Sequence, residues 1–524
     1  MLGGSDVTEP TGDNLLKTRQ VENVLAGNGV LVASNHARAR SMRLCNWNRH
    51  KILAIAETMP FKLNQLFIYV VVWGISLVSG GVPLCAQDSG TGPVAAFTPS
   101  AARGYQLLTT KPYLPPDFDQ QVFDELWKSW PKDLRNQARD ATPAVRRQLA
   151  FTRYGLIESP DHPGEGPAWG YTPDGQGGWV MNCLSCHGGQ VNGKATFGLP
   201  NSNFGLETLV EDVRATKIRL GKKLTHMDMA QLGMPLGSTN GTTNSVIFGV
   251  ALEAKRDADM RVLKKFAIPV MQHHDLDAPP FWNVKKKSRL YYDGLVKKHH
   301  RPLIQFVLLP RNDEKILAGW ENDFRDILAW IESLEAPKYP WTIDTALADT
   351  GRTVFNQHCS KCHGTYGERE SYPEKIVSLD ILGTDPVRLQ ALKPDYRERF
   401  QHSWLSNYNT ADPVWLPNGY LAPPLHGIWA SAPYLHNGSV PTLWHLMHAD
   451  ARPKVWKRTP TGYDQQRLGL EISTSDTVPE GLLSGDRRQY FDTSKASKSA
   501  AGHRFPEALS EDEKRAVLEY LKSL

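Results

Sequence analysis

Two short cysteine motifs constrain this chain more than any other feature. The pentapeptides CLSCH and CSKCH begin at Cys183 and Cys359. In each motif two thiols stand one helical turn apart, so both can reach one edge of a flat ligand, and the next residue adds an imidazole. This spacing is typical of covalent c-type haem attachment, with the histidine as the proximal iron ligand. The sequence therefore predicts two covalently bound haem c groups.

The two motifs supply six predicted cofactor-binding residues, which are Cys183, Cys186, His187, Cys359, Cys362 and His363. Zinc is the first alternative. Paired zinc-binding CxxC motifs stand roughly 15 to 20 residues apart, whereas residues 187–358 separate the two pairs here. A thioredoxin-like redox pair is the second alternative, and it needs a βαβ frame that the sequence does not show. Covalent haem is therefore the interpretation that the spacing favours.

An apolar run from Leu66 to Val78 has the length of a secretory signal core. Cleavage after Ala86 gives a leader of ordinary length that begins at Met59. We therefore expect a signal peptide at residues 59–86, a non-native upstream leader at residues 1–58, and a periplasmic or secreted protein. An uncleaved anchor is the alternative, and only then is a membrane a partner. Export agrees with haem c, because its attachment occurs outside the cytoplasm.

The composition excludes several classes of protein. With 524 residues, 40% of them hydrophobic and 22% charged, the chain is long enough for two or three globular domains and is not disordered. Lys and Arg number 60 against 55 Asp and Glu, which is too even to indicate nucleic acid as a partner.

A repeated pattern indicates the domain organisation. Each haem motif is followed at a similar distance by an amphipathic helix, the first at Trp320–Leu334 and the second after the capping box of Ser510 and Glu513. Two prolines in the segment Ala336–Asp344 predict a linker. We therefore expect a mainly α-helical fold of two cytochrome c-type domains with long loops, each carrying one covalent haem. The predicted bounds are 87–338 for the N-terminal haem domain and 339–524 for the C-terminal cytochrome c domain.

The sixth coordination position of each iron decides its function, because an open iron binds peroxide or O₂ and a closed one transfers electrons. For the second haem the candidates are His436, Met447 and His503. For the first haem no histidine or methionine stands in a diagnostic context, which favours an open site. The residues considered are His226, His273, His274, His299, His300, Met227, Met229, Met234, Met260 and Met271. Trp282 is a candidate for the space between the haems, and Trp429, Tyr434 and Trp444 are candidates for the lining of the second.

The segment Leu421 to Met447 reads LAPPLHGIWASAPYLHNGSVPTLWHLM. It resembles the signature of the bacterial di-haem cytochrome c peroxidase superfamily, and it is most similar to the rubber oxygenase branch. The resemblance extends from about Lys111 to Leu524 and includes both haem motifs, the GTTN segment at Gly241, the PPFW segment at Pro279 and the YFDTS segment at Tyr490.

This resemblance implies a division of labour between the haems. The haem at His187 is the reactive one, and the haem at His363 is six-coordinate and exchanges electrons. In the rubber oxygenase branch a histidine near the chain end closes the second haem, and the matching residue here is His503, with His436 as the fallback.

The resemblance does not carry the substrate with it. The chain after Ala86 is shorter than a rubber oxygenase, so loops that shape a polymer channel are not expected. Tyr291, Tyr292 and Phe306 are the candidates for the aromatic residue over the first haem.

Two functions follow as predictions. The first is an exported di-haem oxidoreductase that reduces peroxide or activates O₂ at the N-terminal haem and receives electrons from a small redox partner through the C-terminal haem. The alternative is a non-catalytic electron-transfer cytochrome with both haems six-coordinate.

Overall fold

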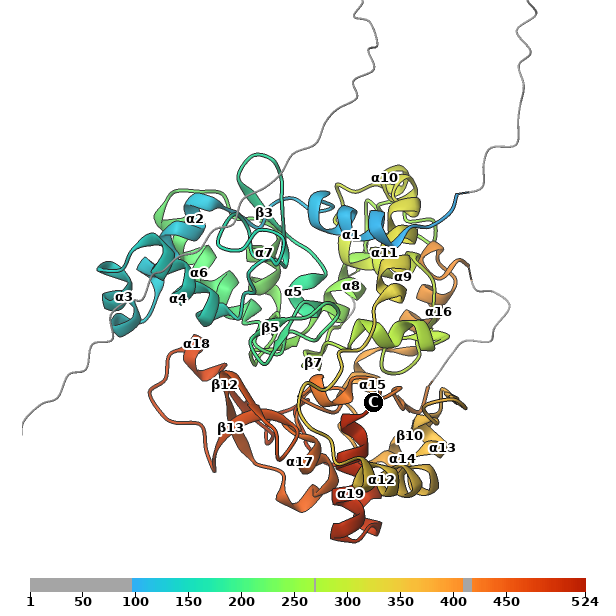
Figure 1. Cartoon of the computed structure of the whole chain (residues 1–524). Helices are drawn as coiled ribbons and strands as arrows, with labels where there is room; N and C mark the ends of the chain where they lie inside the picture. Colours follow the sequence, from blue (N-terminus) through green and yellow to red (C-terminus); the bar gives the residue numbers. More distant parts are fainter. Residues whose placement is uncertain (1–96, 268–269, 409–416) are drawn as a thin grey trace, which may run out of the picture. The chain divides into compact units, whose positions relative to one another are not determined.

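Helices and short strands alternate along the chain in a computed structural model that describes residues 97–267, 270–408 and 417–524. Contacts divide the chain into two units, Met1–Gly90 and Thr91–Leu524, and every described residue belongs to the second (Figure 1). The predicted upstream leader and signal peptide, residues 1–58 and 59–86, lie outside the described residues. Within those residues no helix is both long enough and apolar enough to cross a membrane.

The helices before the predicted linker are α1 (Ala101–Thr110), α2 (Gln120–Glu125), α3 (Lys132–Arg139), α4 (Pro143–Tyr154), α5 (Leu184–His187), α6 (Leu206–Arg219), α7 (His226–Gly233), α8 (Ser245–Glu253), α9 (Arg301–Ile304), α10 (Glu314–Gly319) and α11 (Glu321–Ser333). Those after it are α12 (Thr345–His358), α13 (Ser360–His363), α14 (Leu379–Leu382), α15 (Val387–Ala391), α16 (Pro394–Gln401), α17 (Leu443–Met447), α18 (Ser484–Arg487) and α19 (Glu511–Lys522).

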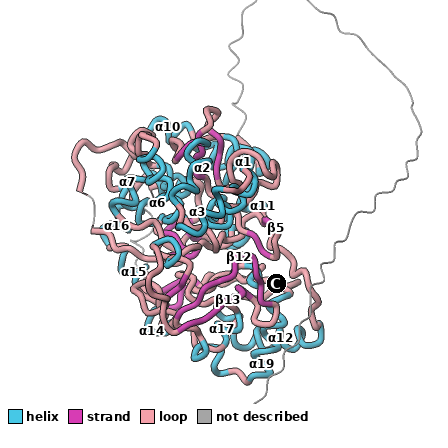
Figure 2. The backbone as a smooth tube through the Cα atoms, turned by 90° about the vertical axis from the view of Figure 1, so that its left-hand side faces the viewer, coloured by secondary structure: helices cyan, strands magenta, loops and turns pink. Residues whose placement is uncertain are grey.

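The strands form small antiparallel sheets, which appear in magenta among the helices in Figure 2. They are β1 (Phe118–Asp119), β2 (Tyr171–Pro173), β3 (Gly178–Met181), β4 (Gln190–Val191), β5 (Lys194–Ala195), β6 (Thr242–Thr243), β7 (Leu276–Asp277), β8 (Arg289–Leu290), β9 (Val296–Lys297), β10 (Ile376–Ser378), β11 (Gly419–Leu421), β12 (Val455–Asp464), β13 (Gly469–Ser475) and β14 (Tyr490–Asp492). The sheet orders are β1-β3-β2, β13-β12-β14, β4-β5, β6-β7, β8-β9 and β10-β11.

These sheets contradict the predicted fold class. The prediction of a mainly α-helical chain of two cytochrome c-type domains is wrong, because small sheets are spread through both halves of the described chain. The physical reason is strand length. Most of the strands have only two or three residues, and an alternation of apolar and polar residues needs about four or more to be visible in a sequence. The domain bounds 87–338 and 339–524 stay a prediction.

One helical arrangement nevertheless occurs twice. Helix α1 packs against α11, and α12 packs against α19. The two helices of each pair lie side by side in Figure 1. Each pair crosses at a glycine, since a Cβ on Gly104 would overlap the backbone of Asp326 and a Cβ on Gly351 would overlap that of Ala516. The predicted amphipathic helices are confirmed as α11 and α19, and Ser510 and Glu513 form the expected capping box. The repeat brackets one CxxCH motif in each half.

Candidate haem sites

The first motif forms a single helical turn. Helix α5 ends at His187 and begins just after Cys183, so both thiols and the imidazole are carried by one short element. The Nδ1 atom of His187 lies 3.0 Å from the backbone oxygen of Pro279. A carbonyl oxygen can only accept a hydrogen bond, so Nδ1 carries the proton and Nε2 keeps a lone pair for a metal. Burial lowers the pKa of His187 to about 4, which also keeps the ring neutral.

The second motif repeats this geometry. Helix α12 runs directly into Cys359, and α13 ends at His363. The Nδ1 atom of His363 lies 2.9 Å from the backbone oxygen of Pro423, and burial lowers the pKa of the ring. Both acceptors belong to the tripeptide Ala-Pro-Pro, at residues 278–280 and 422–424. Sequence reasoning missed these acceptors, although the repeated tripeptide was a visible signal.

The four motif cysteines have similar surroundings. All four cysteines are free and half-buried. Burial raises the pKa of Cys183 to about 11, that of Cys186 to about 12 and that of Cys359 to about 11. These three thiols are therefore protonated at physiological pH in the absence of a cofactor. In the described part of the chain no group of His, Cys, Asp or Glu has the geometry of a metal-ion cluster.

His503 faces the second motif. The ring centres of His363 and His503 lie 6.1 Å apart, with the ring planes at 60°. A metal held between two imidazoles stands roughly 2 Å from each ligating nitrogen, and each ring centre lies roughly 1 Å further, so such a pair needs about 6 Å between ring centres. Burial, and to a smaller extent His363, lowers the pKa of His503 to about 3. The two neutral rings therefore fit a haem iron bound between them.

A built loop holds His503 in this position. His503 adopts a left-handed backbone with φ of 49°, and its N–H donates to the carbonyl oxygen of Leu382 at the end of α14. Arg452 donates to the carbonyl oxygens of Ala500 and Gly502 at 2.5 and 2.7 Å. Two separate segments thus hold the backbone that leads into His503, which is the kind of support that an axial ligand requires.

The other candidates for the sixth ligand have different neighbours. His436 stacks on Tyr420 at 4.2 Å between ring centres and meets Tyr292 edge-on. Met447 is buried on α17 in the hydrophobic cluster that Cys359 joins. His503 is thus the candidate whose ring the structure brings opposite His363, and its role as ligand stays a prediction.

The first motif has a different neighbour. The ring of His187 stacks on Phe281, with 3.8 Å between ring centres and 15° between the planes. Among the described residues, no second histidine ring lies against His187 as His503 lies against His363.

The histidines considered for the first haem are dispersed. His226 lies 3.3 Å from Asp117, His273 lies 3.3 Å from Asp275, and His299 stacks on His300. The methionines considered for the same position are also spread out. Met227 lines a small cavity, Met229 is exposed, and Met234 accepts a hydrogen bond from Asn244. Met260 is buried in the hydrophobic cluster against which Cys183, Met234 and Met271 pack.

The aromatic candidates for the position over the first haem lie in different surroundings. Tyr291 packs against the hydrophobic cluster that Cys183 joins and accepts a hydrogen bond from Gln305. Tyr292 donates to the carbonyl oxygen of Asp277 at 3.0 Å, and Phe306 is exposed on the surface. Tyr291 is therefore the candidate that shares a core with the first motif.

Trp282 joins the two proximal sides. It lies three residues after Pro279, which accepts from His187, and its Nε1 donates to the carbonyl oxygen of His426 at 2.7 Å. His426 in turn lies three residues after Pro423, which accepts from His363. A short backbone segment on each side and one tryptophan hydrogen bond therefore connect the two imidazoles.

A glycine makes this contact possible. Gly427 has φ of 62°, and a Cβ there would lie 3.0 Å from the Trp282 ring. Trp429 packs in the same buried cluster as Trp282 and donates to the carbonyl oxygen of Pro337. Tyr434 is buried in the cluster that Cys359 joins, whereas Trp444 stacks on His448.

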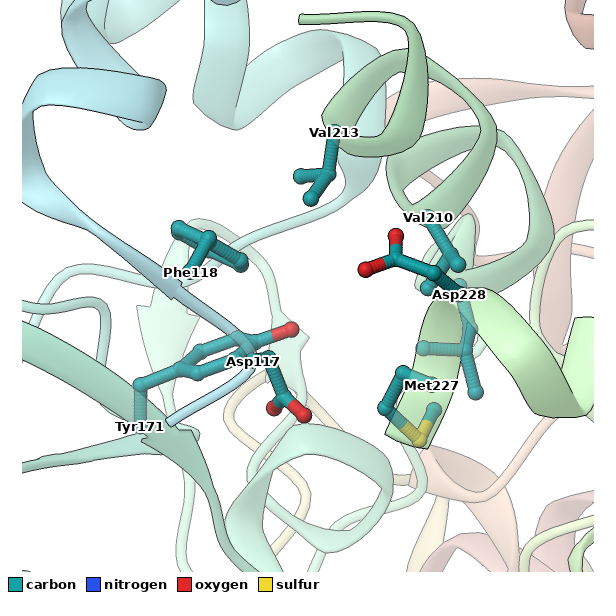
Figure 3. A pocket seen from close by; sticks show the side chains of 8 residues that line it. Asp117, Phe118, Tyr171, Val210, Val213, Met227 and Asp228 are labelled. Carbon is teal, nitrogen blue, oxygen red and sulfur yellow. The ribbon is translucent and has the colours of Figure 1, made fainter. Parts of the chain in front are cut away.

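A second polar cluster lies behind the first motif. Figure 3 shows Asp117 and Asp228 facing one small cavity, together with Tyr171 and Met227. Asp117 accepts from the N–H of Met181, two residues before Cys183, and burial raises the pKa of Asp117 to about 7. The buried Lys217 donates to Asp228 at 2.5 Å. This cluster supports the strand that leads into the motif, and no sequence pattern indicated it.

Comparisons with known proteins agree with these sites in part. Residues 419–457 match the family described as "RoxA-like, cytochrome c-like". This segment contains Pro423 and begins the β-hairpin of β12 and β13. The match supports a relationship to RoxA-like cytochromes c and indicates a haem-containing cytochrome with covalent haem c.

Two curated relatives come from Sinorhizobium fredii. The chain is 26% identical to the uncharacterized protein y4iM over 258 residues, which is 43% of this chain and 56% of the relative. It is 29% identical to the uncharacterized protein y4iJ over 257 residues, which is 36% of this chain and 41% of the relative. The chain thus spans about half the length of the curated relatives that it matches.

Proposed function

We propose that this protein is an exported di-haem oxidoreductase. In this proposal the N-terminal haem reduces peroxide or activates O₂, and the C-terminal haem relays electrons. A haem iron with one open axial position binds and activates peroxide or O₂, and one closed by two histidines passes electrons. Cys183, Cys186 and His187 would hold the first group, and Cys359, Cys362, His363 and His503 the second.

One observation carries the proposal, namely the difference between the two proximal histidines. His363 faces His503 at the separation that a shared metal requires, whereas His187 has no such partner among the described residues. Each imidazole donates its Nδ1 proton to a proline carbonyl, which strengthens the electron donation of the opposite nitrogen. The two sites therefore have the same arrangement around the proximal histidine, and they differ in whether a second histidine faces it.

The connection through Trp282 supports transfer between the two sites. Its hydrogen bond to the His426 carbonyl closes a route from the segment that supports His187 to the segment that supports His363. Electron transfer weakens with every gap between bonded atoms, so a route of covalent and hydrogen bonds favours it. The donor in this proposal is a small redox partner that docks near the second haem, and nucleic acid has no part in it.

Export belongs to the same proposal. It is supported by the apolar run Leu66–Val78 and by the chemistry of haem c, which is attached outside the cytoplasm. Mass spectrometry of the mature protein from periplasm would give Gln87 as the first residue if the leader is cleaved after Ala86.

The deciding experiment is a ligand titration of the purified holoprotein. A pyridine haemochrome assay should count two haems, and cyanide or carbon monoxide should perturb the spectrum of one of them. Hydrogen peroxide should then be consumed at the expense of a reduced donor. If no ligand perturbs either haem, the oxidoreductase proposal is wrong.

A non-catalytic electron-transfer cytochrome is the second candidate. Met234 and Met271 pack against the hydrophobic cluster that Cys183 joins, and a thioether is a known axial ligand of c-type haem. In that case the ferric protein would show two low-spin haems and would bind no cyanide.

A further inference from the structure

Two neighbouring helices, α15 and α16, carry a buried pair of arginines that face one carboxylate. Arg388 on α15 is 1% exposed, and Arg397 on α16 is 3% exposed. Both face the fully buried Asp293, with Nη2 of Arg388 at 3.3 Å and Nη2 of Arg397 at 2.8 Å from its carboxylate oxygens. The pair therefore carries two positive charges against the single negative charge of Asp293.

Several donors of this pair lack a partner. The Nε and Nη1 atoms of Arg388 and the Nη1 atom of Arg397 are buried without a hydrogen bond to any described residue. A guanidinium cannot escape this cost by losing its proton, because it stays charged in proteins. Buried, unpaired charge is among the most expensive features that a fold can contain, so these donors require an anion.

The neighbouring histidines add no charge of either sign to this pair. His274 and His436 lie nearby, and burial together with the charge of Arg388 lowers the pKa of His274 to about 4 and that of His436 to about 3. Both rings are therefore neutral at physiological pH. His274 donates from Nδ1 to the carbonyl oxygen of Gln272 at 2.9 Å, and its buried Nε2 has no partner among the described residues.

The position of the pair points to the first haem motif. Leu392, which lies between the two arginines in the sequence, and Phe400, which follows them, belong to the buried hydrophobic cluster that includes Leu184, one of the two residues between Cys183 and Cys186. The carbonyl oxygen of His436 accepts from the N–H of Asp277, two residues before the Pro279 that accepts from His187. The arginine pair and the first motif therefore border one continuous core.

We infer that Arg388 and Arg397 bind a carboxylate of the cofactor, a propionate of the haem attached at Cys183 and Cys186. Carboxylate matches the planar fork of a guanidinium and forms charge-assisted hydrogen bonds with it. The inference rests on the proposed function only in requiring a haem at His187, and it holds whether or not that haem is open. A free carboxylate from solution would satisfy the same donors and is the rival occupant.

The test is the redox titration of Arg388→Met holoprotein, followed by the optical spectrum of each haem. Loss of a positive charge beside the porphyrin favours the ferric form, so the midpoint potential of the haem at His187 should fall while that of the haem at His363 should not. Arg153→Met is the control, because Arg153 is also paired with a carboxylate, that of Asp212 at 3.0 Å, and its described ion pairs, to Asp212 and Asp486, involve neither haem motif. It should leave both potentials unchanged.

Two further measurements test the inference even if Arg388→Met fails to fold. The propionate bending band in the resonance Raman spectrum of the wild-type protein should lie where strongly hydrogen-bonded propionates lie, and it should shift in the milder Arg388→Lys variant. Acetate and hexanoate are then titrated into the wild type.

The outcomes are distinct. A spectral change with hexanoate that disappears in Arg388→Lys would assign the pair to a soluble carboxylate and overturn the inference. Unchanged potentials and an unchanged propionate band in the Arg388 variants would overturn it as well. Failure of cyanide to bind would refute the open first haem and leave these results in place.

Discussion

The two haem motifs share one side and differ on the other. At both motifs a one-turn helix carries the cysteines, and the following histidine donates to the first proline of a Pro-Pro pair. The second motif also has His503 opposite its imidazole, on a loop held by Arg452 and Leu382, whereas the imidazole of the first motif is stacked by Phe281 and faces no histidine ring among the described residues. Under the proposed function, the same means of holding the cofactor accompanies two different uses of it, because the distal group of the second site comes from an independent segment.

Removal of one cysteine pair at a time should have the largest effect. Cys183→Ser with Cys186→Ser should reduce the haem count from two to one and abolish the spectral change with cyanide, since the group that binds the ligand is no longer attached. Cys359→Ser with Cys362→Ser should also leave one haem but retain that change. Pyridine haemochrome and cyanide difference spectra measure both. If the two double variants behave alike, the proposed division of labour is wrong.

Removal of His503 should make the second site resemble the first. His503→Ala should convert the second haem from low-spin six-coordinate to five-coordinate, so that cyanide or carbon monoxide binds two haems instead of one. Optical and electron paramagnetic resonance spectra report this change. Met447→Leu is the control, because it conserves volume in the buried cluster and should leave the spectra unaltered. A low-spin second haem in His503→Ala would direct the search to His436.

The contact between the two sites should be sensitive to one methyl group. Gly427→Ala forces a left-handed alanine against the Trp282 ring, which should cost about 1–3 kcal/mol of unfolding free energy and slow electron exchange between the haems. Denaturant unfolding and flash reduction measure these quantities. Gly319→Ala is a matched control, since a Cβ there meets open space within a helix. Exchange at the wild-type rate in Gly427→Ala would exclude Trp282 from the route.

The last comparison concerns the cluster behind the first motif, whose effect is visible only as a change of stability with pH; no such cluster is described for the second motif. The pKa of Asp117 is about 7 in the folded protein and near 3.8 when unfolded. Between these values the folded state holds a proton that the unfolded state has released, so stability falls as pH rises, by at most about 1.4 kcal/mol per pH unit. Asp117→Asn removes this slope, and its stability relative to wild type should increase from about pH 4 to about pH 7.

The neighbouring His226 also contributes to the pH dependence of stability. The quantity to measure is therefore the difference in unfolding free energy between proteins with and without Asp117→Asn. Burial lowers the pKa of His226 to about 4, so its contribution to stability is lost as pH falls from its unfolded value near 6.5. This slope opposes that of Asp117, and His226 lies only 3.3 Å from Asp117, so the comparison is made in a His226→Gln background, where the slope of His226 is absent. Urea unfolding of His226→Gln and of His226→Gln with Asp117→Asn at several pH values isolates Asp117. A difference that does not vary with pH would show that Asp117 is ionised throughout.

The sequence was informative where chemistry is local. Cys183, Cys186 and His187 lie within five residues, so their spacing alone predicts the attachment site. The amphipathic helices α11 and α19 were visible from their periodicity, and the structure confirms them. His503 was named through resemblance, and the structure places its ring opposite His363.

The sequence was uninformative where the partners are backbone atoms or distant residues. Pro279 and Pro423 act through carbonyl oxygens, which every residue has, so only their repetition could have marked them. Arg388 and Asp293 meet across 95 positions of chain, and nothing local distinguishes them from surface charges. Strands of two or three residues leave no periodicity at all, which is why the predicted fold class was wrong.

The Pro-Pro pairs have a consequence for the order of assembly. Pro279 precedes another proline, and so does Pro423, so both backbones are confined to an extended conformation before any cofactor arrives. The direction of each acceptor carbonyl is thereby set by ring geometry, and the imidazole that donates to it is aimed in advance. The histidine ligand is then already oriented in the apoprotein, so attachment of the porphyrin costs less conformational entropy.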